Sequence, residues 1–406
     1  MRALQEGNLW LARAVRERPL TIRHLLPGFG AVPLASAQQP RDGMVGAALS
    51  LSAVQAGQHA RVELWGWAPR SGRVTRACGD GIKTIAAWRW ARLPYCDLRY
   101  YLPFMLHAAT ATPVDIVHAH SDPYLLMIRR GRARVLHYNT TPPTDPSPFY
   151  QRMVRQADAI ICCSEFIRCR FLQTGSYPPD RVFVVHNGVD LSRFANANGD
   201  ELRRRWGIRA DELLILYAGA IAWEKGLIHL VRALQRLRGR TAMRLMVAGA
   251  SDLWQSPDDP PGRVDRYEQE VQAASEGLPV HWLGSVPHGE MGKVYQAADI
   301  CVCPSVWDDP HPTVVVEAMA AGRPVIGSAV GGIPETVVAG ETGLLIPPGD
   351  PAALAAALQQ LLAAPDQREA MGRRGRMRAA AHFTWGAAAE RIERIYAMAL
   401  ASAVGT

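Results

Sequence analysis

Residues 299–328 read DICVCPSVWDDPHPTVVVEAMAAGRPVIGS and contain the pattern on which the fold prediction rests. The apolar runs at 299–303 and 323–327 have the length and composition of buried strands. Between them, residues 314–321 have the apolar content of a short buried helix. A strand, a helix and a second strand in this order predict a βαβ unit with parallel strands.

The same alternation extends over the whole chain. In the first half, strand patterns occur at 20–26, 61–66, 114–118, 133–137, 159–163 and 181–185. In the second half they occur at 213–218, 243–248, 279–283, 299–303, 323–327 and 343–346. Helical patterns lie between strands at 44–58, 226–237, 288–297, 314–321 and 351–362. Two sets of similar plan predict an α/β protein with two doubly wound domains.

The polar stretch 192–205 separates the two sets of strands, so the domain boundary is expected within 191–210. A second irregular stretch, 251–262, contains two aspartates followed by two prolines and is predicted to be a surface loop. Residues 1–19 precede the first strand and are open to either a flexible or an amphipathic extension.

The composition is that of a globular protein. The 406 residues are 48% apolar and 20% charged, which excludes a disordered or coiled-coil protein. No uncharged apolar run reaches the roughly 18 residues needed to span a membrane. Arg13, Arg16 and Arg18 interrupt the apolar core that a signal peptide requires. We therefore expect a soluble, cytoplasmic protein.

Charge is spread unevenly along the chain. Residues 1–205 carry 27 Lys and Arg against 15 Asp and Glu, whereas the remainder carries 18 against 22. This asymmetry is typical of a half that meets an anionic partner, although an arginine-rich solvated surface explains it equally well. No basic run is interleaved with aromatic residues, so nucleic acid is not an expected partner. Only Lys83, Lys225 and Lys293 are lysines.

The seven cysteines are odd in number and contain no C-x-x-C pair. The pairs 162–163 and 301–303 fall inside apolar strand patterns, so we expect small buried thiols in a reducing compartment rather than disulfides or zinc ligands. No cluster has the spacing of a metal site, and no metal is predicted.

The start of the helix after residue 312 is the first candidate binding site. Thr313 is a suitable N-cap, which would leave the amides of Val314 and Val315 pointing out of the helix as a site for phosphate. Glu317 lies about one turn further, within reach of sugar hydroxyls beside that phosphate. Asp309 is eight positions earlier, on the loop. By themselves, two acids at this spacing are also compatible with an ordinary solvated loop.

In its full context, the stretch 307–322 resembles the E-x7-E motif of the retaining glycosyltransferases of family 4 (glycosyl transferases group 1). Other landmarks occur in the order of that family: 187–190 (NGVD) with Phe194, 219–226, 299–305, 322–326 (GRPVI), 331–335 (GGIPE) and 340–345 (GETGLL). The resemblance is specific over 181–400 and weaker before that.

The resemblance implies the GT-B fold, in which two Rossmann-like doubly wound domains face a central cleft. It also implies that the amphipathic C-terminal stretch 387–400 crosses back onto the first domain. The domains are accordingly expected at 1–196 with 384–406, which would bind the acceptor, and at 197–383, which would bind the nucleotide-sugar donor.

The resemblance assigns roles residue by residue. Glu317 would hold the ribose hydroxyls of a nucleotide, and Asp309 occupies the first-Glu position, whose carboxylate faces the donor sugar. Lys225 matches the lysine that neutralises the departing diphosphate, a task suited to a compact ammonium. Gly219 begins the phosphate-binding turn, and Thr313 and Val314 lie at the helix start within the stretch 307–322, where their amides would meet phosphate.

In the first domain, residues 41–44 (RDGM) precede a helix and are similar to the glycine loop of the family, with Gly43 allowing close approach to the donor phosphates. His137 ends the run 135–137, which resembles the strand whose terminal histidine faces the donor sugar. His118 and His120 end the preceding strand and are secondary candidates. For all three histidines the alternative is an ordinary strand-end residue.

Three positions depart from the pattern of the family. Ala220 replaces an arginine that often follows the glycine of the phosphate turn, which removes one cation. Asp309 is one methylene shorter than Glu, and Pro312 stands where the family usually has Gly and offers no N–H. These departures point either to an altered sugar preference or to a protein that binds without catalysing.

The resemblance thus implies a metal-independent, retaining hexosyltransferase without a cofactor, acting on a nucleotide-sugar that is UDP- or GDP-linked. The acceptor would be a sugar, a lipid-linked or a small molecule in polysaccharide, glycolipid or natural-product glycoside synthesis. The alternatives are a non-catalytic protein on this fold and another GT-B enzyme, such as a phosphorylase or a sugar-nucleotide epimerase. The basic first half is compatible with peripheral contact with the anionic inner face of a membrane.

Overall fold

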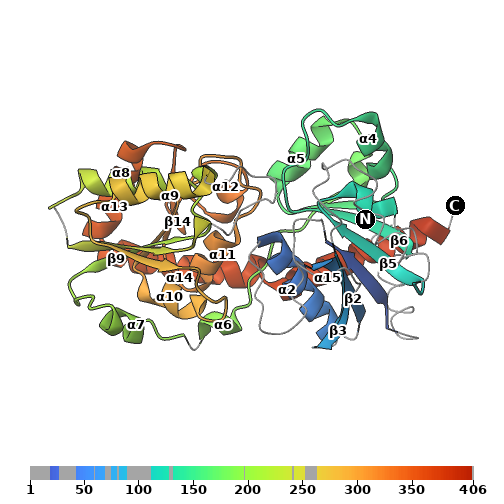
Figure 1. Cartoon of the computed structure of the whole chain (residues 1–406), viewed down its shortest axis with the longest axis horizontal. Helices are drawn as coiled ribbons and strands as arrows, with labels where there is room; N and C mark the ends of the chain where they lie inside the picture. Colours follow the sequence, from blue (N-terminus) through green and yellow to red (C-terminus); the bar gives the residue numbers. More distant parts are fainter. Residues whose placement is uncertain are drawn as a thin grey trace. The chain divides into compact units, whose positions relative to one another are not determined.

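A computed structural model describes residues 19–26, 43–58, 60–68, 75–79, 82–88, 111–127, 131–195, 197–239, 242–251 and 263–404. The chain forms two compact units (Figure 1). Unit 1 comprises Met1–Asn187 and Trp385–Thr406, and unit 2 comprises Gly188–Thr384. The division thus falls after Asn187 rather than at the expected 196, because Val189 and Phe194 pack into the hydrophobic core of unit 2.

Unit 1 contains an eight-stranded sheet in the order β3-β4-β2-β1-β5-β6-β7-β8. The strands are β1 Thr21–Leu25, β2 Arg61–Ala68, β3 Thr75–Gly79, β4 Ile82–Trp88, β5 Val114–His120, β6 Gly131–Tyr138, β7 Ala159–Cys162 and β8 Val182–Val184. All neighbours are parallel except β3 and β4. The chain proceeds outward from the centre in both directions, so β1 and β5 flank the topological switch point, where doubly wound sheets bind ligands.

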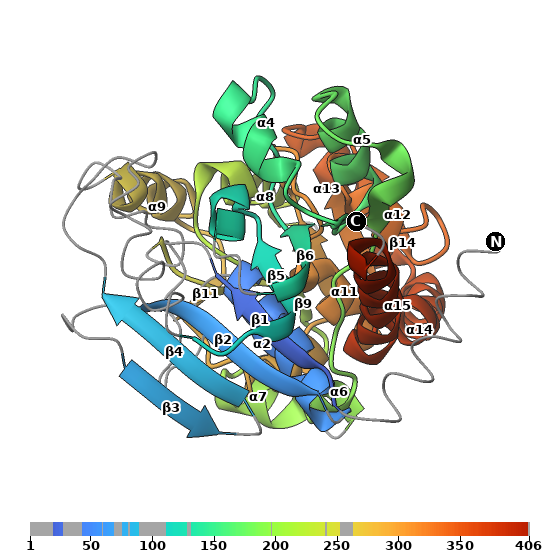
Figure 2. The same cartoon turned by 90° about the vertical axis from the view of Figure 1, so that its right-hand side faces the viewer.

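The antiparallel pair β3 and β4 lies at the edge of this sheet (Figure 2) and was not among the predicted strands. Its sequences, TRACG and IKTIAAW, include charged and small residues and lack the continuous apolar run of a strand that is buried on both faces.

Two helices distant in sequence cover one face of the sheet of unit 1. Helix α2 (Gly43–Gly57) and the C-terminal helix α15 (Trp385–Val404) contact each other and share a core with strands β1, β5, β6 and β7. The opposite face packs against η1 (Pro123–Met127), α4 (Pro148–Val154) and α5 (Glu165–Gln173). The C-terminal helix therefore belongs to the first unit, as the resemblance implied.

Unit 2 contains a six-stranded, entirely parallel sheet in the order β11-β10-β9-β12-β13-β14. The strands are β9 Leu213–Ala218, β10 Met243–Ala248, β11 Val280–Gly284, β12 Ile300–Cys303, β13 Val325–Ser328 and β14 Gly343–Ile346. The inner strands β9, β10, β12 and β13 are mostly buried apolar runs, as parallel strands covered on both faces require. Strands β9 and β12 flank its switch point.

Helices cover both faces of the second sheet. One face packs against α8 (Leu227–Arg236), α9 (Arg263–Ala274) and α13 (Pro351–Ala363). The other packs against α10 (Met291–Ala297) and α11 (Thr313–Ala320), and α14 (Pro365–His382) contacts α11. The remaining short elements are η2 Pro179–Arg181, α6 Ser192–Ala195, α7 Asp200–Arg205, η3 Trp223–Lys225 and α12 Ile333–Thr336.

The predicted doubly wound plan is confirmed, and every predicted strand and helix is present within a few residues of its expected range. Residues 1–18, Arg41 and Asp42 of the glycine loop, and the predicted loop from residue 252 to 262 lie outside the described residues. Of the described cysteines, Cys162, Cys163, Cys301 and Cys303 are buried and Cys169 is exposed. None of the described helices is long and apolar enough to cross a membrane.

Candidate active site

Three loops of unit 2 meet beyond the carboxyl ends of β9, β12 and β13. Gly226 ends the short turn η3 with a positive φ of 69°, and a Cβ on it would lie 2.0 Å from the carbonyl oxygen of Pro304. The amide of Val306 donates a hydrogen bond of 2.9 Å to the carbonyl of Glu224. The loop after β9 and the loop after β12 are thus joined through their backbones, and only glycine fits at position 226.

The third loop fixes the backbone of Asp309. Gly331 has a φ of 55°, and a Cβ on it would lie 2.1 Å from the Asp309 carbonyl oxygen. The amide of Gly332 donates to that same oxygen at 2.8 Å, and the amide of Asp309 donates to the carbonyl of Trp307 at 2.8 Å. The position of Asp309 is therefore determined by its own turn and by the loop after β13.

Lys225 and Asp309 form an ion pair at this junction. Lys225 Nζ donates to Asp309 Oδ2 at 2.6 Å, and Ser305 Oγ donates to the same oxygen at 3.3 Å. The Asp309 side chain is 5% exposed and that of Lys225 is 19% exposed. The ring centroid of Trp307 lies 5.7 Å from Nζ. A charge-assisted hydrogen bond this short, largely removed from water, holds both side chains in place.

Helix α11 begins one residue earlier than predicted. The N-cap is Pro312, in an extended conformation, and Thr313 is the first helical residue, so the prediction that Thr313 is the N-cap was wrong. The prediction of a free Val315 amide was also wrong, because this amide donates to the Pro312 carbonyl at 3.2 Å. Thr313 and Val314 lie in the first turn of α11. Their amides therefore have no carbonyl acceptor in a preceding turn of the helix.

Glu317 is buried on the first turns of α11 and is held by two side chains. Tyr295 donates its hydroxyl to Oε2 at 3.0 Å, and Arg193 donates to Oε1 at 3.4 Å. Arg193 also donates to the carbonyl of His288 at 2.6 Å. Burial, reinforced by the carboxylate of Glu317, raises the pKa of Tyr295 well above its usual value, so Tyr295 remains a donor.

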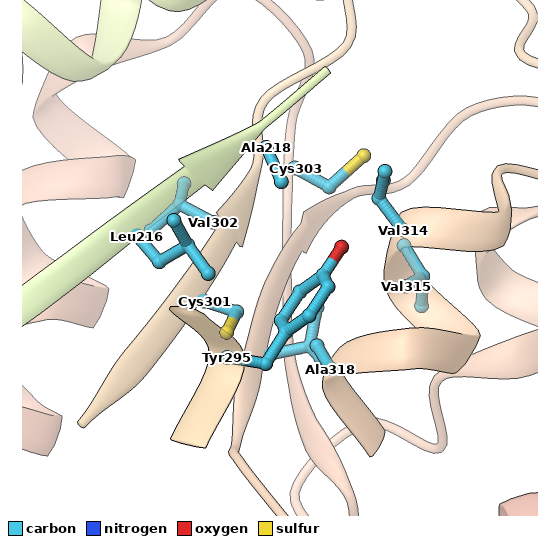
Figure 3. A pocket seen from close by; sticks show the side chains of 10 residues that line it. Leu216, Ala218, Tyr295, Cys301, Val302, Cys303, Val314, Val315 and Ala318 are labelled. Atoms are coloured by element: carbon cyan, nitrogen blue, oxygen red, sulfur yellow. The ribbon is translucent and has the colours of Figure 1, made fainter. Parts of the chain in front are cut away.

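A small cavity lies beneath the start of α11. Its lining is apolar apart from one hydroxyl and two thiols, and consists of Leu216, Ala218, Tyr295, Cys301, Val302, Cys303, Val314, Val315, Ala318 and Val325. Figure 3 shows the Tyr295 ring standing in it, with its hydroxyl directed toward Val314. Burial raises the pKa of Cys301 to about 12 and that of Cys303 to about 11, so both remain neutral thiols.

The turn after β9 is tight. Gly219 has a φ of 135°, and a Cβ on Gly249 would lie 1.8 Å from the carbonyl oxygen of Gly219. Ala220 is buried, and its carbonyl accepts a hydrogen bond of 2.6 Å from the Tyr217 hydroxyl. This position therefore contributes packing and no charge.

The predicted residues of the first domain lie in unit 1. Gly43 is the first residue of α2, and His137 lies near the carboxyl end of β6. His137 is buried together with His24, His118 and His120, and burial lowers the pKa of His137 to about 3 and that of His24 to about 4. The pKa values of His118 and His120 are also lowered by burial. All four imidazoles are neutral at pH 7.

Three of these rings each have one nitrogen that could ligate a metal, and the three nitrogens lie within 4.8 Å of one another. The rings are those of His24, His118 and His120. Two of those nitrogens are already hydrogen-bonded to each other, since His24 Nδ1 lies 3.0 Å from His120 Nε2. This cluster of neutral imidazoles could bind a transition metal or could pair internally.

The structure places Gly219, Lys225, Asp309, Thr313, Val314 and Glu317 in unit 2 and Gly43 and His137 in unit 1. Sequence reasoning did not single out Ser305, Tyr295 or Arg193, which contact the predicted acids. Only Ser305 had a signal, because it lies within the resembling stretch 299–305. His24 could have been noticed as a second ionisable residue, beside Arg23, within the strand pattern 20–26.

Comparison with known families agrees with this geometry. The model described as Glycosyltransferase Family 4 matches residues 42–193, and the model described as Glycosyl transferases group 1 matches residues 198–378.

Two curated relatives match about three fifths of the chain. Alpha-maltose-1-phosphate synthase of Mycolicibacterium smegmatis is 35% identical over 256 residues, covering 60% of this chain and 64% of the relative. D-inositol 3-phosphate glycosyltransferase of Corynebacterium diphtheriae is 32% identical over 252 residues, covering 61% and 57%. The matched region thus spans less than two thirds of the length of either relative.

Solved structures share the fold over nearly the whole chain. A sucrose-phosphate synthase from Thermosynechococcus elongatus has a TM-score of 0.77 at 24% identity and covers 94% of this chain and 100% of its own. HepE from Anabaena, solved in complex with UDP-glucose, has a TM-score of 0.70 at 19% identity and covers 92% and 98%. With both family models matching in order along two doubly wound units, the chain belongs to the group 1, family 4 glycosyltransferases and has the GT-B fold.

Proposed function

We propose that this protein transfers a sugar from a nucleotide-sugar to an acceptor hydroxyl with retention of anomeric configuration. The observation that carries the proposal is the Lys225–Asp309 ion pair, which lies at the switch point of unit 2 in the loops that lead to α11. A UDP-linked donor is favoured because HepE, a neighbour in fold, was solved with UDP-glucose.

In the proposed reaction, the bond between the anomeric carbon and the diphosphate oxygen breaks, and a bond to the acceptor oxygen forms on the same face. The leaving diphosphate gains negative charge, and we assign its stabilisation to Lys225 and the first-turn amides of Thr313 and Val314. Its oxygen helps to take the proton of the acceptor hydroxyl. With a lysine and a helix N-terminus in these roles, the reaction needs no metal.

The remaining residues bind and orient the donor. Glu317 accepts hydrogen bonds from the ribose hydroxyls, held for this by Tyr295 and Arg193. Asp309, anchored by Gly331 and Gly332, faces the donor sugar. Gly219 allows the diphosphate to approach the backbone. By the same resemblance, we assign Gly43 to the donor phosphates and His137 to the donor sugar.

The alternative is a non-catalytic protein on the same fold. It is favoured by Ala220, which is buried and uncharged, and by Pro312, which caps α11 without an N–H to offer. This protein would bind a nucleotide weakly or not at all and would not turn over a donor.

A thermal-shift series with UDP, GDP, ADP and dTDP in the presence of EDTA separates the two. A ligand at 100 times its Kd adds about 2.7 kcal/mol to stability, which is several degrees for domains of this size. One nucleotide that alone raises the midpoint identifies the donor base, and nucleotide-sugar turnover in EDTA then follows. The anomeric configuration of the product, read by NMR, tests retention. If no nucleotide shifts the midpoint, the non-catalytic alternative takes precedence.

The acceptor is proposed to be a sugar, lipid-linked or phosphorylated small molecule that meets the basic first half of the chain. Peripheral contact with anionic lipid is one form of this proposal, since each Lys or Arg near such a surface contributes about 1 kcal/mol. Vesicle flotation tests it: binding to anionic but not neutral vesicles is expected, and equal flotation with both contradicts it.

A further inference from the structure

Six buried side chains of unit 1 form one continuous chain of hydrogen bonds across the switch point of its sheet. In the order in which the hydrogen bonds connect them, they are His120, His24, Gln55, Tyr396, His118 and His137. All six are almost completely buried. They come from β5, β1, α2, α15, β5 and β6, respectively. Helix α15 therefore reaches the carboxyl edge of the sheet through a side-chain hydroxyl.

The five contacts are close. His120 Nε2 lies 3.0 Å from His24 Nδ1, and His24 Nε2 lies 2.8 Å from Gln55 Oε1. Gln55 Nε2 lies 3.4 Å from the Tyr396 hydroxyl oxygen, which lies 2.5 Å from His118 Nδ1. His118 Nε2 lies 3.2 Å from His137 Nδ1.

Because each imidazole is neutral and carries one proton, the direction of every bond follows from Gln55. The carbonyl oxygen of Gln55 can only accept, so His24 carries its proton on Nε2. Its bare Nδ1 then accepts, which places the proton of His120 on Nε2 as well. The Nδ1 of His120 is left bare.

The other branch follows in the same way. The Gln55 amide donates to the Tyr396 oxygen, so the hydroxyl proton of Tyr396 is donated to His118 Nδ1. If the Tyr396 oxygen instead accepted hydrogen bonds from both Gln55 and His118, its own proton would have no acceptor among the described residues. His118 then carries its proton on Nε2 and donates to His137 Nδ1, so His137 also carries its proton on Nε2. Burial raises the pKa of Tyr396 and keeps the hydroxyl protonated.

Within this series of hydrogen bonds, only the two terminal ring nitrogens lack a partner among the described residues. They are His120 Nδ1 and His137 Nε2, both buried. The two rings are register neighbours on β5 and β6, with centroids 5.7 Å apart. One end is an acceptor and the other is a donor, which is the pair of roles that sugar hydroxyls can satisfy. Unpaired polar atoms in a buried site call for such a partner.

We propose that Gln55 and Tyr396 are positioning residues that give all four histidines the Nε2-protonated tautomer, so that His137 presents an N–H donor and His120 a bare nitrogen. The assignment of the two ends to hydroxyls of a sugar rests on the proposed function. The tautomers themselves rest on the hydrogen-bond chain and on the neutrality of the buried rings, and not on the proposed function. The C-terminal helix thereby controls hydrogen bonding at the carboxyl edge of unit 1.

Nitrogen NMR of the full-length protein labelled with 15N-histidine tests the tautomers directly. Long-range proton–nitrogen spectra distinguish a protonated Nε2 from a protonated Nδ1 in each neutral ring. We expect His24, His118, His120 and His137 all to be Nε2-protonated and not to titrate between pH 5.5 and 8. An Nδ1-protonated ring among the four, or a metal bound in stoichiometric amount, would overturn the proposal.

Two variants interrupt the chain in different ways. Tyr396→Phe removes the shared hydroxyl, so His118 and His137 should lose their fixed tautomer, whereas His24 and His120 should keep theirs. Gln55→Glu, ionised, can only accept, so the Tyr396 proton is drawn to the carboxylate. In that variant His118 and His137 should become Nδ1-protonated while His24 and His120 remain unchanged.

Tyr177→Phe is the matched control, because its hydroxyl donates to the Ala157 carbonyl at 2.9 Å in the same unit but outside the chain. It should leave all four tautomers unchanged. If either test variant leaves His137 as it is in the wild type, Gln55 and Tyr396 do not set the tautomer.

Activity provides the second measurement, with UDP-glucose as the probe donor. We expect Tyr396→Phe and Gln55→Glu to lower kcat/KM about tenfold, which is the equivalent of one hydrogen bond. The thermal shift caused by UDP should not change in either variant, because UDP lacks the sugar. Unchanged kcat/KM in a variant whose His137 tautomer has inverted would overturn the sugar assignment. Failure of all four nucleoside diphosphates to bind the wild type would instead contradict the proposed function and leave the tautomer result standing.

Discussion

The Nζ of Lys225 lies 2.6 Å from Oδ2 of Asp309, so the cation assigned to a leaving diphosphate is already paired with a carboxylate of the protein. The short aspartate reaches the lysine because two glycines set the distance between their loops, Gly226 against Pro304 and Gly331 against Asp309 itself. A diphosphate bound at this edge would share Lys225 with Asp309. The methylene missing from Asp309, relative to Glu, therefore affects the phosphate side of the site as well as the sugar side.

Lys225→Ala should impair both stability and turnover. It leaves the carboxylate of Asp309 buried and unpaired, which typically costs about 3 kcal/mol, and it removes the charge that stabilises the leaving group. We expect a lower free energy of unfolding in urea and a turnover reduced by a factor of at least about 100, the loss of one strong electrostatic donor. Both are measured on purified protein with the donor found in the nucleotide screen.

Lys293→Ala is the matched control, because Lys293 forms an exposed pair with Glu290 in the same unit. Water and salt screen exposed pairs, which contribute little to stability, so both measurements should stay near wild type. The double variant Lys225→Ala/Asp309→Asn should recover most of the lost stability but none of the turnover. Equal losses for the two lysine variants would contradict the role of Lys225.

Gly331→Ala should displace Asp309. A Cβ at this position adds a clash with the Asp309 carbonyl to the cost of a positive φ, about 1–2 kcal/mol for the backbone and about 1–3 kcal/mol for overpacking. Gly340→Ala is the control, since Gly340 has a φ of 78° but no heavy atom within 4 Å of the added Cβ. The Tm should fall further for Gly331→Ala, and only this variant should lose the nucleotide-induced shift. Similar behaviour of the two variants would show that Gly331 does not support the site.

Much of the fold could be predicted because parallel strands that are covered on both faces consist of continuous runs of apolar residues. The β3–β4 pair has no such run. Helix α14 was missed because it is largely polar and its buried positions are mostly small residues, Gly372, Gly375 and Ala379, with Met371 as the exception. A helix that packs through small residues leaves little apolar periodicity in its sequence.

The site could be predicted in its residues but not in its contacts. Lys225 and Asp309 were each found from a motif, yet they are 84 positions apart, and their pairing depends on how two loops pack. The hydrogen bond between Tyr396 and His118 spans 278 positions and requires α15 to dock on the first sheet. No local pattern encodes either distance.

Acid should destabilise unit 1 through its buried histidines. The folded state lowers the pKa of His24 from 6.5 to about 4 and that of His137 from 6.5 to about 3. Between these values and 6.5 the unfolded chain binds more protons, so stability falls as the pH falls through this window. At pH 5 each histidine should cost about 2 kcal/mol relative to pH 7.5, from 1.36 kcal/mol per pKa unit.

Urea unfolding at pH 5.0 and 7.5 measures this loss. His24→Asn removes one of the titrating groups and should make the difference between the two pH values smaller. His382→Asn is the control, because His382 is exposed at the end of α14 and should not change the difference. Equal stability of the wild type at both pH values would show that the buried imidazoles do not govern its acid sensitivity.

Glu317→Gln should weaken binding of ribonucleotides more than of deoxyribonucleotides. If Glu317 accepts a hydrogen bond from the ribose, the neutral amide loses a charge-assisted bond of about 1.5–3 kcal/mol, and the preference of the protein for UDP over 2′-deoxy-UDP should shrink about tenfold or more by calorimetry. Tyr295→Phe, which frees Oε2 of the carboxylate, should have a smaller effect in the same direction. Glu290→Gln, an exposed acid in the same unit, should leave the ratio unchanged. A ratio that is insensitive to Glu317 would place the ribose elsewhere.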